Sequence, residues 1–240
     1  MSDSKIRILP WLWHPTNLVS SWLLRLRHRV TVVSHGRRPT GAVLVAAKHG
    51  SGWDIPAMSW QVHALLGLRS NFQMGSFVGY AVLGRIVPLL RVCGGFPVMR
   101  PKEILRLKER RGLTKDEAMQ VMASINAEAD DVRREILDRG QPLVFFPEGT
   151  RDNDHVRPIR GTHEIESAVA ASARGVSVEV WPVLLRYGPP TWRRDLRIDF
   201  LEPFGVAGLT SNEIAERIHA AWTTAWHASA SDGFRGRVSP

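Results

Sequence analysis

The chain has 240 residues, of which 44% are apolar and 23% are charged, which excludes a wholly disordered protein and fits one folded domain with short additions. The formal net charge of +9 favours anionic partners, such as phospholipid headgroups, phosphorylated substrates or nucleic acid. Cys93 is the only cysteine, so an internal disulfide is excluded and a reducing compartment is expected.

Residues 1–35 are predicted to form an N-terminal amphipathic segment. From Leu18 onward its apolar residues follow one face of a helix, and arginines come directly afterwards. Tryptophans beside a basic cluster are typical of a helix that lies in a membrane interface. A helix packed on its own domain is the alternative. No apolar run reaches the roughly 18 to 20 residues of a membrane span, and no secretory pattern is recognised, so we expect a protein that is soluble or lies on a membrane.

The first half of the remaining chain alternates expected strands and helices. The apolar run 42–47 predicts a buried strand, and 54–66 predicts a helix with a proline in its first turn. A weak strand is expected at 70–74. The apolar but glycine-containing stretch 77–92 predicts an irregular segment or a short buried helix, and 96–99 predicts a short strand or extended turn.

The second half continues the alternation. The charge run 102–115 is interpreted as a solvated face, and the capping box from Thr114 to Glu117 predicts a helix that runs to about Arg139. Further elements are expected as a strand at 143–146, a helix at 162–174, strands at 176–185 and 196–201, and a helix at 211–228. This order predicts an α/β fold with a mainly parallel or mixed central sheet flanked by helices. The folded domain is placed at 36–228 and a frayed tail at 229–240.

His49 and Asp54 are the first residues with evident chemistry, because they follow the buried strand at 42–47. In open α/β sheets ligands bind at the carboxyl ends of the strands. An imidazole there could accept a proton from a hydroxyl, and a carboxylate could fix its tautomer. Taken alone, the spacing also fits a solvated histidine and a helix-capping aspartate.

A second segment, 145–151 (FFPEGTR), begins at the end of the strand expected at 143–146 and continues into a polar turn. It contains a proline, then a Glu-Gly-Thr turn, then Arg151. Taken alone it fits a strand-to-loop turn with a surface arginine. Together with the earlier histidine and aspartate, it points to a site at one edge of the sheet.

The chain resembles the glycerolipid acyltransferase family, the 1-acyl-sn-glycerol-3-phosphate acyltransferases and their relatives. Four family motifs occur in order over about residues 40–190, at 48–54 (KHGSGWD), 94–100 (GGFPVMR), 146–151 (FPEGTR) and 178–183 (VEVWPV). The first and third are close to diagnostic, and the fourth is weak.

The resemblance implies transfer of a fatty acyl group from a thioester of coenzyme A or acyl carrier protein to the hydroxyl of a lysophospholipid. His49 would be the general base and Asp54 its orienting partner. The residues implied to bind the acceptor are Arg100, Glu148, Gly149, Thr150 and Arg151, with Arg160 and Pro182 as further donor or acceptor contacts. No metal, cofactor or covalent intermediate is implied.

Two departures from the family pattern bear on the acceptor more than on the reaction. Many relatives have a lysine on the strand after the first motif, where this chain has Gln73. After the third motif, relatives show an aromatic-basic-x-Gly turn, where this chain has Pro158-Ile159-Arg160-Gly161. Arg160 either replaces the basic residue or is a surface residue.

The sequence leaves three hypotheses. An enzyme that makes phosphatidic acid at the cytoplasmic face of the cell membrane is favoured, and another lipid acceptor, such as a lyso-aminolipid or a glycolipid, is a close variant. A non-catalytic protein that binds anionic lipid is the second hypothesis, although lipid binding needs no base. Nucleic-acid binding is disfavoured because no helix-turn-helix, zinc spacing or aromatic-basic pattern is recognised.

Overall fold

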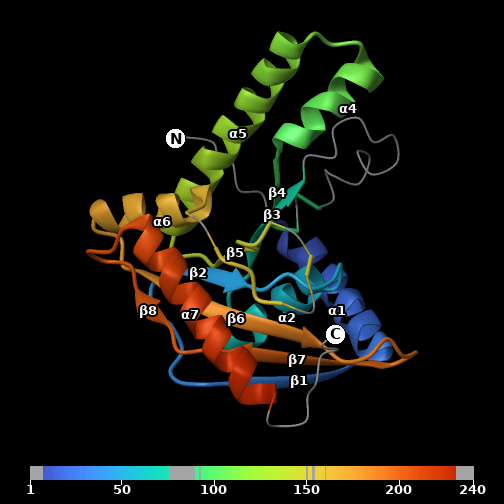
Figure 1. The fold of residues 1–240 in the computed structure, drawn as a ribbon, viewed down its shortest axis with the longest axis vertical. Helices are drawn as coiled ribbons and strands as arrows, with labels where there is room; N and C mark the ends of the chain where they lie inside the picture. Colours follow the sequence, from blue (N-terminus) through green and yellow to red (C-terminus); the bar gives the residue numbers. More distant parts are fainter. Residues whose placement is uncertain are drawn as a thin grey trace.

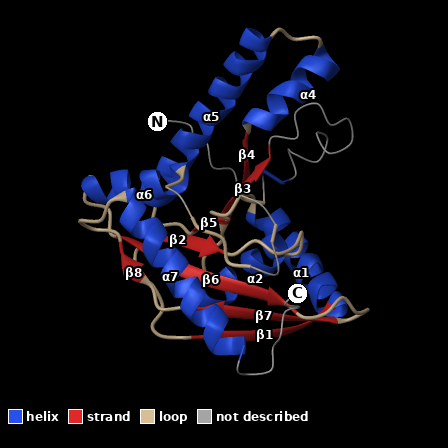
Figure 2. Cartoon of the chain, viewed as in Figure 1, coloured by secondary structure: helices blue, strands red, loops and turns tan. Residues whose placement is uncertain are grey.

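The computed structural model describes residues 8–230 except 76–89, 92, 150, 153–154 and 160, and shows a mixed sheet with helices on both faces (Figures 1 and 2). The strand order is β1-β7-β6-β2-β5-β3-β4, with β8 paired to β6. Neighbouring strands are parallel except β6–β7 and β6–β8. The predicted α/β fold with a mainly parallel or mixed sheet is confirmed.

The strands are β1 (His28–Ser34), β2 (Ala42–Ala47), β3 (Asn71–Gly75), β4 (Gly95–Val98), β5 (Leu143–Phe145), β6 (Val178–Tyr187), β7 (Arg194–Phe200) and β8 (Phe204–Gly205). The helices are α1 (Pro10–Arg27), α2 (Asp54–Leu66), α4 (Pro101–Arg111), α5 (Lys115–Asp138), α6 (His163–Ala173) and α7 (Ser211–Ala230). Among the helices of the described residues, none combines the length and the apolar content of a membrane span.

The central strands are buried on both faces, which explains their continuous apolar sequences. All six residues of β2 are buried. The odd-numbered ones pack in a cluster with residues of α1 and α2, and the even-numbered ones pack in a second cluster with residues of α5, α6 and α7. Because each buried Val or Leu side chain contributes about 1.5–3 kcal/mol relative to exposure, these two layers hold β2 firmly in the middle of the sheet.

Three elements were not predicted. Residues 28–34, assigned to the N-terminal segment, form β1, which pairs in parallel with β7. The charge run 102–115, interpreted as a solvated face, contains α4, whose Leu107 packs on Met99 and Ala118 while most of its charged residues are exposed. The two-residue strand β8 was also missed. Most of the stretch 77–92 and of the tail 229–240 lies outside the described residues.

The parallel strands bring several motifs to one edge of the sheet. Strands β2, β3, β4, β5 and β6 all run in the same direction, so their carboxyl ends meet there. His49 follows β2, Arg151 follows β5, and Arg100 follows β4 just before α4. In Figure 1, α4 and α5 extend from this sheet as a pair of long helices.

Candidate active site

His49 and Asp54 form a hydrogen-bonded pair at the carboxyl end of β2. Nδ1 of His49 lies 2.7 Å from Oδ2 of Asp54. His49 is in the loop after β2, and Asp54 is the first residue of α2, so a short loop between strand and helix sets their separation. The structure therefore brings together the two residues that would act as base and orienting carboxylate.

The Asp54 carboxylate is completely buried and accepts several hydrogen bonds besides that of His49. The backbone N–H groups of Gly50 and Ser51 donate to Oδ2 at 2.7 and 2.8 Å. The Tyr187 hydroxyl donates to Oδ1 at 2.5 Å. Burial raises the pKa of Tyr187 far above its ordinary value, and the charge of Asp54 adds to this effect, so the hydroxyl stays protonated. These donors fix the orientation of the carboxylate that holds His49.

Arg151 contacts the other nitrogen of His49. Its Nε–H donates to Nε2 of the imidazole at 3.2 Å. Since Nε2 accepts this bond, the ring proton is on Nδ1, where Asp54 accepts it. The Phe146 ring stacks on the imidazole with a centroid separation of 4.4 Å, and the backbone N–H of Asp152 donates to the His49 carbonyl at 2.9 Å. The loop after β5 is thus tied directly to the loop after β2.

The Glu148 side chain is buried beneath this loop beside Lys48. Both side chains are 0% exposed, and Nζ of Lys48 lies 3.9 Å from Oε2 of Glu148. Lys48 also donates to the Asp152 carbonyl. Burial raises the pKa of Glu148, and the charge of Lys48 partly offsets this. The predicted acceptor residue Glu148 therefore faces the protein interior, where it pairs with the lysine that precedes the base.

The remaining predicted acceptor residues are more widely spread. Gly149 has a φ of +67°, a conformation that glycine adopts readily, and its N–H closes the turn on the Phe146 carbonyl at 3.1 Å. Arg100 is exposed at the end of β4, three strand positions from β2, which is about 14 Å along the sheet. Thr150 and Arg160 lie outside the described residues.

Pro182 and Gln73 both contact other parts of the protein. Pro182 is buried in the middle of β6 opposite Ala46, and its carbonyl accepts a hydrogen bond from Leu201 at 3.0 Å. Gln73 accepts a hydrogen bond at 2.9 Å from Arg133, a buried α5 residue that also lies 3.4 Å from Glu164. Where many relatives have a lysine, this chain thus has an amide bound to a buried arginine.

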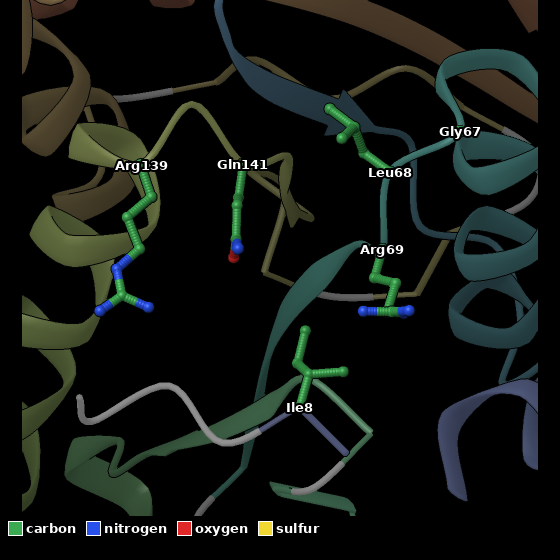
Figure 3. Close-up of a pocket in the computed structure, with 6 residues that line it drawn as sticks. All are labelled: Ile8, Gly67, Leu68, Arg69, Arg139 and Gln141. Carbon is green, nitrogen blue, oxygen red and sulfur yellow. The ribbon is translucent and has the colours of Figure 1, made fainter. Parts of the chain in front are cut away.

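A cavity of about 300 Å³ lies at the opposite edge of the sheet (Figure 3). Its lining includes Arg69 and Gln141, which precede β3 and β5, and Arg139, which follows α5. The carboxyl ends of the strands carry the His49 pair, so this cavity is separate from the candidate site. Within the described part of the chain, no group of three or more His, Cys, Asp or Glu residues could hold a metal ion.

Comparison with known proteins gives the family. The model of the acyltransferase family matches residues 29–186, a span that contains all four motifs and the His49 pair. The chain belongs to the acyltransferase family, and the family membership expected from the motifs is confirmed. Its structure is similar to the crystal structure of PlsC, the 1-acyl-sn-glycerophosphate (LPA) acyltransferase from Thermotoga maritima, with a TM-score of 0.58 and 18% identity over 95% of this chain and 81% of that chain. At this identity, the match concerns the fold. A comparison with curated proteins found no match.

Proposed function

We propose that this protein transfers a fatty acyl group from an acyl thioester to the hydroxyl of a lysophospholipid, with 1-acyl-sn-glycerol 3-phosphate as the favoured acceptor and phosphatidic acid as the product. The observation that carries the proposal is the His49 imidazole, which is held through Nδ1 by a buried carboxylate and directs Nε2 toward an arginine. The carrier of the acyl group is either coenzyme A or acyl carrier protein.

The proposed chemistry needs little beyond a base and accurate positioning, because a thioester is already activated. The acceptor hydroxyl gives its proton to Nε2 of His49 as its oxygen bonds to the thioester carbonyl carbon. Asp54 stabilises the imidazolium that forms. The C–S bond then breaks, and the imidazolium returns the proton to the departing thiolate.

Arginines at the same sheet edge support a phosphorylated acceptor. Arg151 contacts the proposed base, His49, and Arg100 follows a strand that lies about 14 Å from β2 along the sheet. A guanidinium binds a phosphate with two parallel hydrogen bonds. Gln73, which is bound by the buried Arg133, leaves an acceptor without a phosphate, such as a lyso-aminolipid or a glycolipid, as the alternative.

The test is a thiol-release assay with the purified protein, a panel of acyl thioesters, and acceptors with and without a phosphate. We expect release that depends on the acceptor and is fastest with 1-acyl-sn-glycerol 3-phosphate, accompanied by phosphatidic acid in the lipid extract. Equal rates with the phosphate-free acceptor would reject the favoured acceptor. Lipid binding without release from any thioester would favour the non-catalytic alternative.

We also propose that the protein lies on the cytoplasmic face of the cell membrane through α1. One side of this helix packs on α2, with Trp13 and Leu24 buried. Large apolar side chains remain exposed, namely Leu9, Trp11, Leu18, Val19, Trp22, Leu23 and Leu26. A groove of about 600 Å³ begins where α1 ends, and its lining includes Arg25, Arg29 and Arg193 but no carboxylate. An exposed apolar stripe beside arginines suits an interface with anionic lipid.

Replacing Leu18 and Trp22 together by serine should weaken binding to vesicles containing phosphatidylglycerol by about tenfold to a hundredfold, because two large side chains no longer enter the interface. Vesicle sedimentation measures this. The matched control is the pair Leu105→Ser and Met119→Ser, which removes exposed apolar residues from α4 and α5. Equal losses in both variants would show that α1 is not the contact.

A further inference from the structure

The proton-accepting nitrogen of His49 is already occupied in this structure. Nδ1 faces Asp54 at 2.7 Å, which leaves Nε2 as the basic nitrogen. Nε–H of Arg151 donates to Nε2 at 3.2 Å. An imidazole nitrogen has one lone pair in the ring plane, so an acceptor hydroxyl and Arg151 cannot both use it. The hydrogen bond from Arg151 to Nε2 must therefore break before His49 can accept a proton.

The surrounding loop holds Arg151 in this position. The backbone N–H of Asp152 donates to the His49 carbonyl at 2.9 Å, which ties the residue after Arg151 to the loop that carries the imidazole. The guanidinium also lies along the loop after β2, where a Cβ built on Gly52 would be 4.0 Å from Nη2. The arginine therefore lies across both polar segments of the candidate site.

The nearby carboxylates face other cations. Oδ2 of Asp152 accepts a hydrogen bond from Nε of Arg157 at 2.7 Å, and Glu148 is buried beside Lys48. Arg151 itself is exposed. Its bond to a neutral imidazole is weaker than the paired, charge-assisted bonds that a guanidinium makes to a phosphate. A phosphate that reaches Arg151 should therefore draw the guanidinium away from Nε2.

We propose that Arg151 is a latch that covers the base until the phosphate of the acceptor binds it. This inference rests on the proposed acyl transfer and adds a regulation of the same site. In the closed state Nε2 cannot activate water, so the thioester is protected from hydrolysis. When the phosphate binds Arg151, Nε2 accepts the proton of the acceptor hydroxyl, the new C–O bond forms, and the C–S bond breaks. The latch thereby makes the reaction selective for acceptors that carry a phosphate.

The kinetic test uses Arg151→Met, which keeps an unbranched side chain but has no N–H donor. With 1-acyl-sn-glycerol 3-phosphate, transfer should fall about tenfold to a hundredfold because a charged hydrogen bond is lost. With monoacylglycerol, and with water alone, thiol release should instead rise severalfold. Arg111→Met, at the exposed end of α4, should change none of these rates. The latch is wrong if all three rates fall together in Arg151→Met, or if the rates with monoacylglycerol and with water stay unchanged.

A second readout does not depend on turnover. Diethyl pyrocarbonate modifies a neutral imidazole at an accessible nitrogen, and mass spectrometry of peptides can follow His49, with the exposed His155 as internal reference. We expect severalfold faster modification of His49 in Arg151→Met than in the wild type, and faster modification of the wild type when glycerol 3-phosphate is added. Equal rates in the two proteins would overturn the latch. Faster modification in a protein that releases no thiol would instead reject the proposed function, while Arg151 would still be shown to cover Nε2.

Discussion

Replacing His49 by alanine should lower the rate of acyl transfer by about 10²–10⁴-fold, the usual contribution of a positioned general base. An alcohol is a poor nucleophile until its proton is removed, and the described residues offer no second histidine beside Asp54 within hydrogen-bonding distance. The thiol-release assay measures the change. Binding to anionic vesicles should be unaffected, because the proposed lipid contact is made by the exposed apolar residues of α1 and not by His49.

The matched control is His163→Ala. The His163 side chain is 75% exposed at the start of α6, where it lies 3.3 Å from Glu166. We expect wild-type transfer from this variant and an unchanged melting temperature. If His49→Ala retains a rate within tenfold of the wild type while folding normally, His49 is not the base, and another group must take the hydroxyl proton.

Elements with strong local signals were predictable from the sequence. The apolar run at 42–47 became β2, and the capping box became the start of α5, where the Thr114 hydroxyl accepts from the Glu117 N–H at 3.3 Å and the Glu117 carboxylate accepts from the Thr114 N–H at 2.8 Å. In both cases the residues that determine the element are close neighbours in the chain.

The two longer missed elements, β1 and α4, were missed for different reasons. Strand β1 is the outermost strand in the order, and most of its residues are at least partly exposed, so it shows no clean alternation of apolar and polar residues. Helix α4 has a single fully buried leucine, Leu107, among many charges. Its ends nevertheless carry local helix signals, with Pro101 at the first position, Glu103 in the first turn and the left-handed Gly112 at the C-cap. The helix could therefore have been predicted from the sequence, and only its packing against α5 depends on tertiary structure.

Some contacts of the candidate site could likewise be predicted from the sequence, and others could not. His49 and Asp54 are separated by one short loop, so their pairing could be inferred from spacing. Tyr187 donates to Asp54 from 133 positions away in the chain, and only the parallel arrangement of β6 beside β2 brings them together. A tyrosine at the end of the strand that carries the fourth motif was the available signal. The burial of Glu148 beside Lys48 could not be inferred, because it depends on how the loop after β5 folds over β2.

Replacing Lys48 by methionine should lower the free energy of unfolding by about 3–5 kcal/mol, the usual effect of removing one partner of a buried ion pair. Methionine fills a similar volume, but the fully buried Glu148 carboxylate loses the ammonium at 3.9 Å. Urea unfolding at pH 8 measures the change. Lys115→Met, at the exposed start of α5, should have almost no effect. The double variant Lys48→Met, Glu148→Gln should recover much of the loss, because no buried carboxylate then lacks its cation.

The loss of unfolding free energy caused by Lys48→Met should also depend on pH. The direction of this dependence follows from the raised pKa of Glu148. Burial raises the pKa of Glu148 while Lys48 opposes the rise, so the variant should have a still higher pKa. The folded state then keeps a proton that the unfolded chain loses above about pH 4.3. The free energy of unfolding must therefore fall as the pH rises from about 4.3 to the pKa of Glu148 in the folded state. The fall should be steeper in the variant. The difference in unfolding free energy between wild type and variant should therefore shrink as the pH is lowered toward about 4. A difference that is constant between pH 4 and 8 would show that the lost stability comes from packing around Lys48 and not from the charge of Glu148.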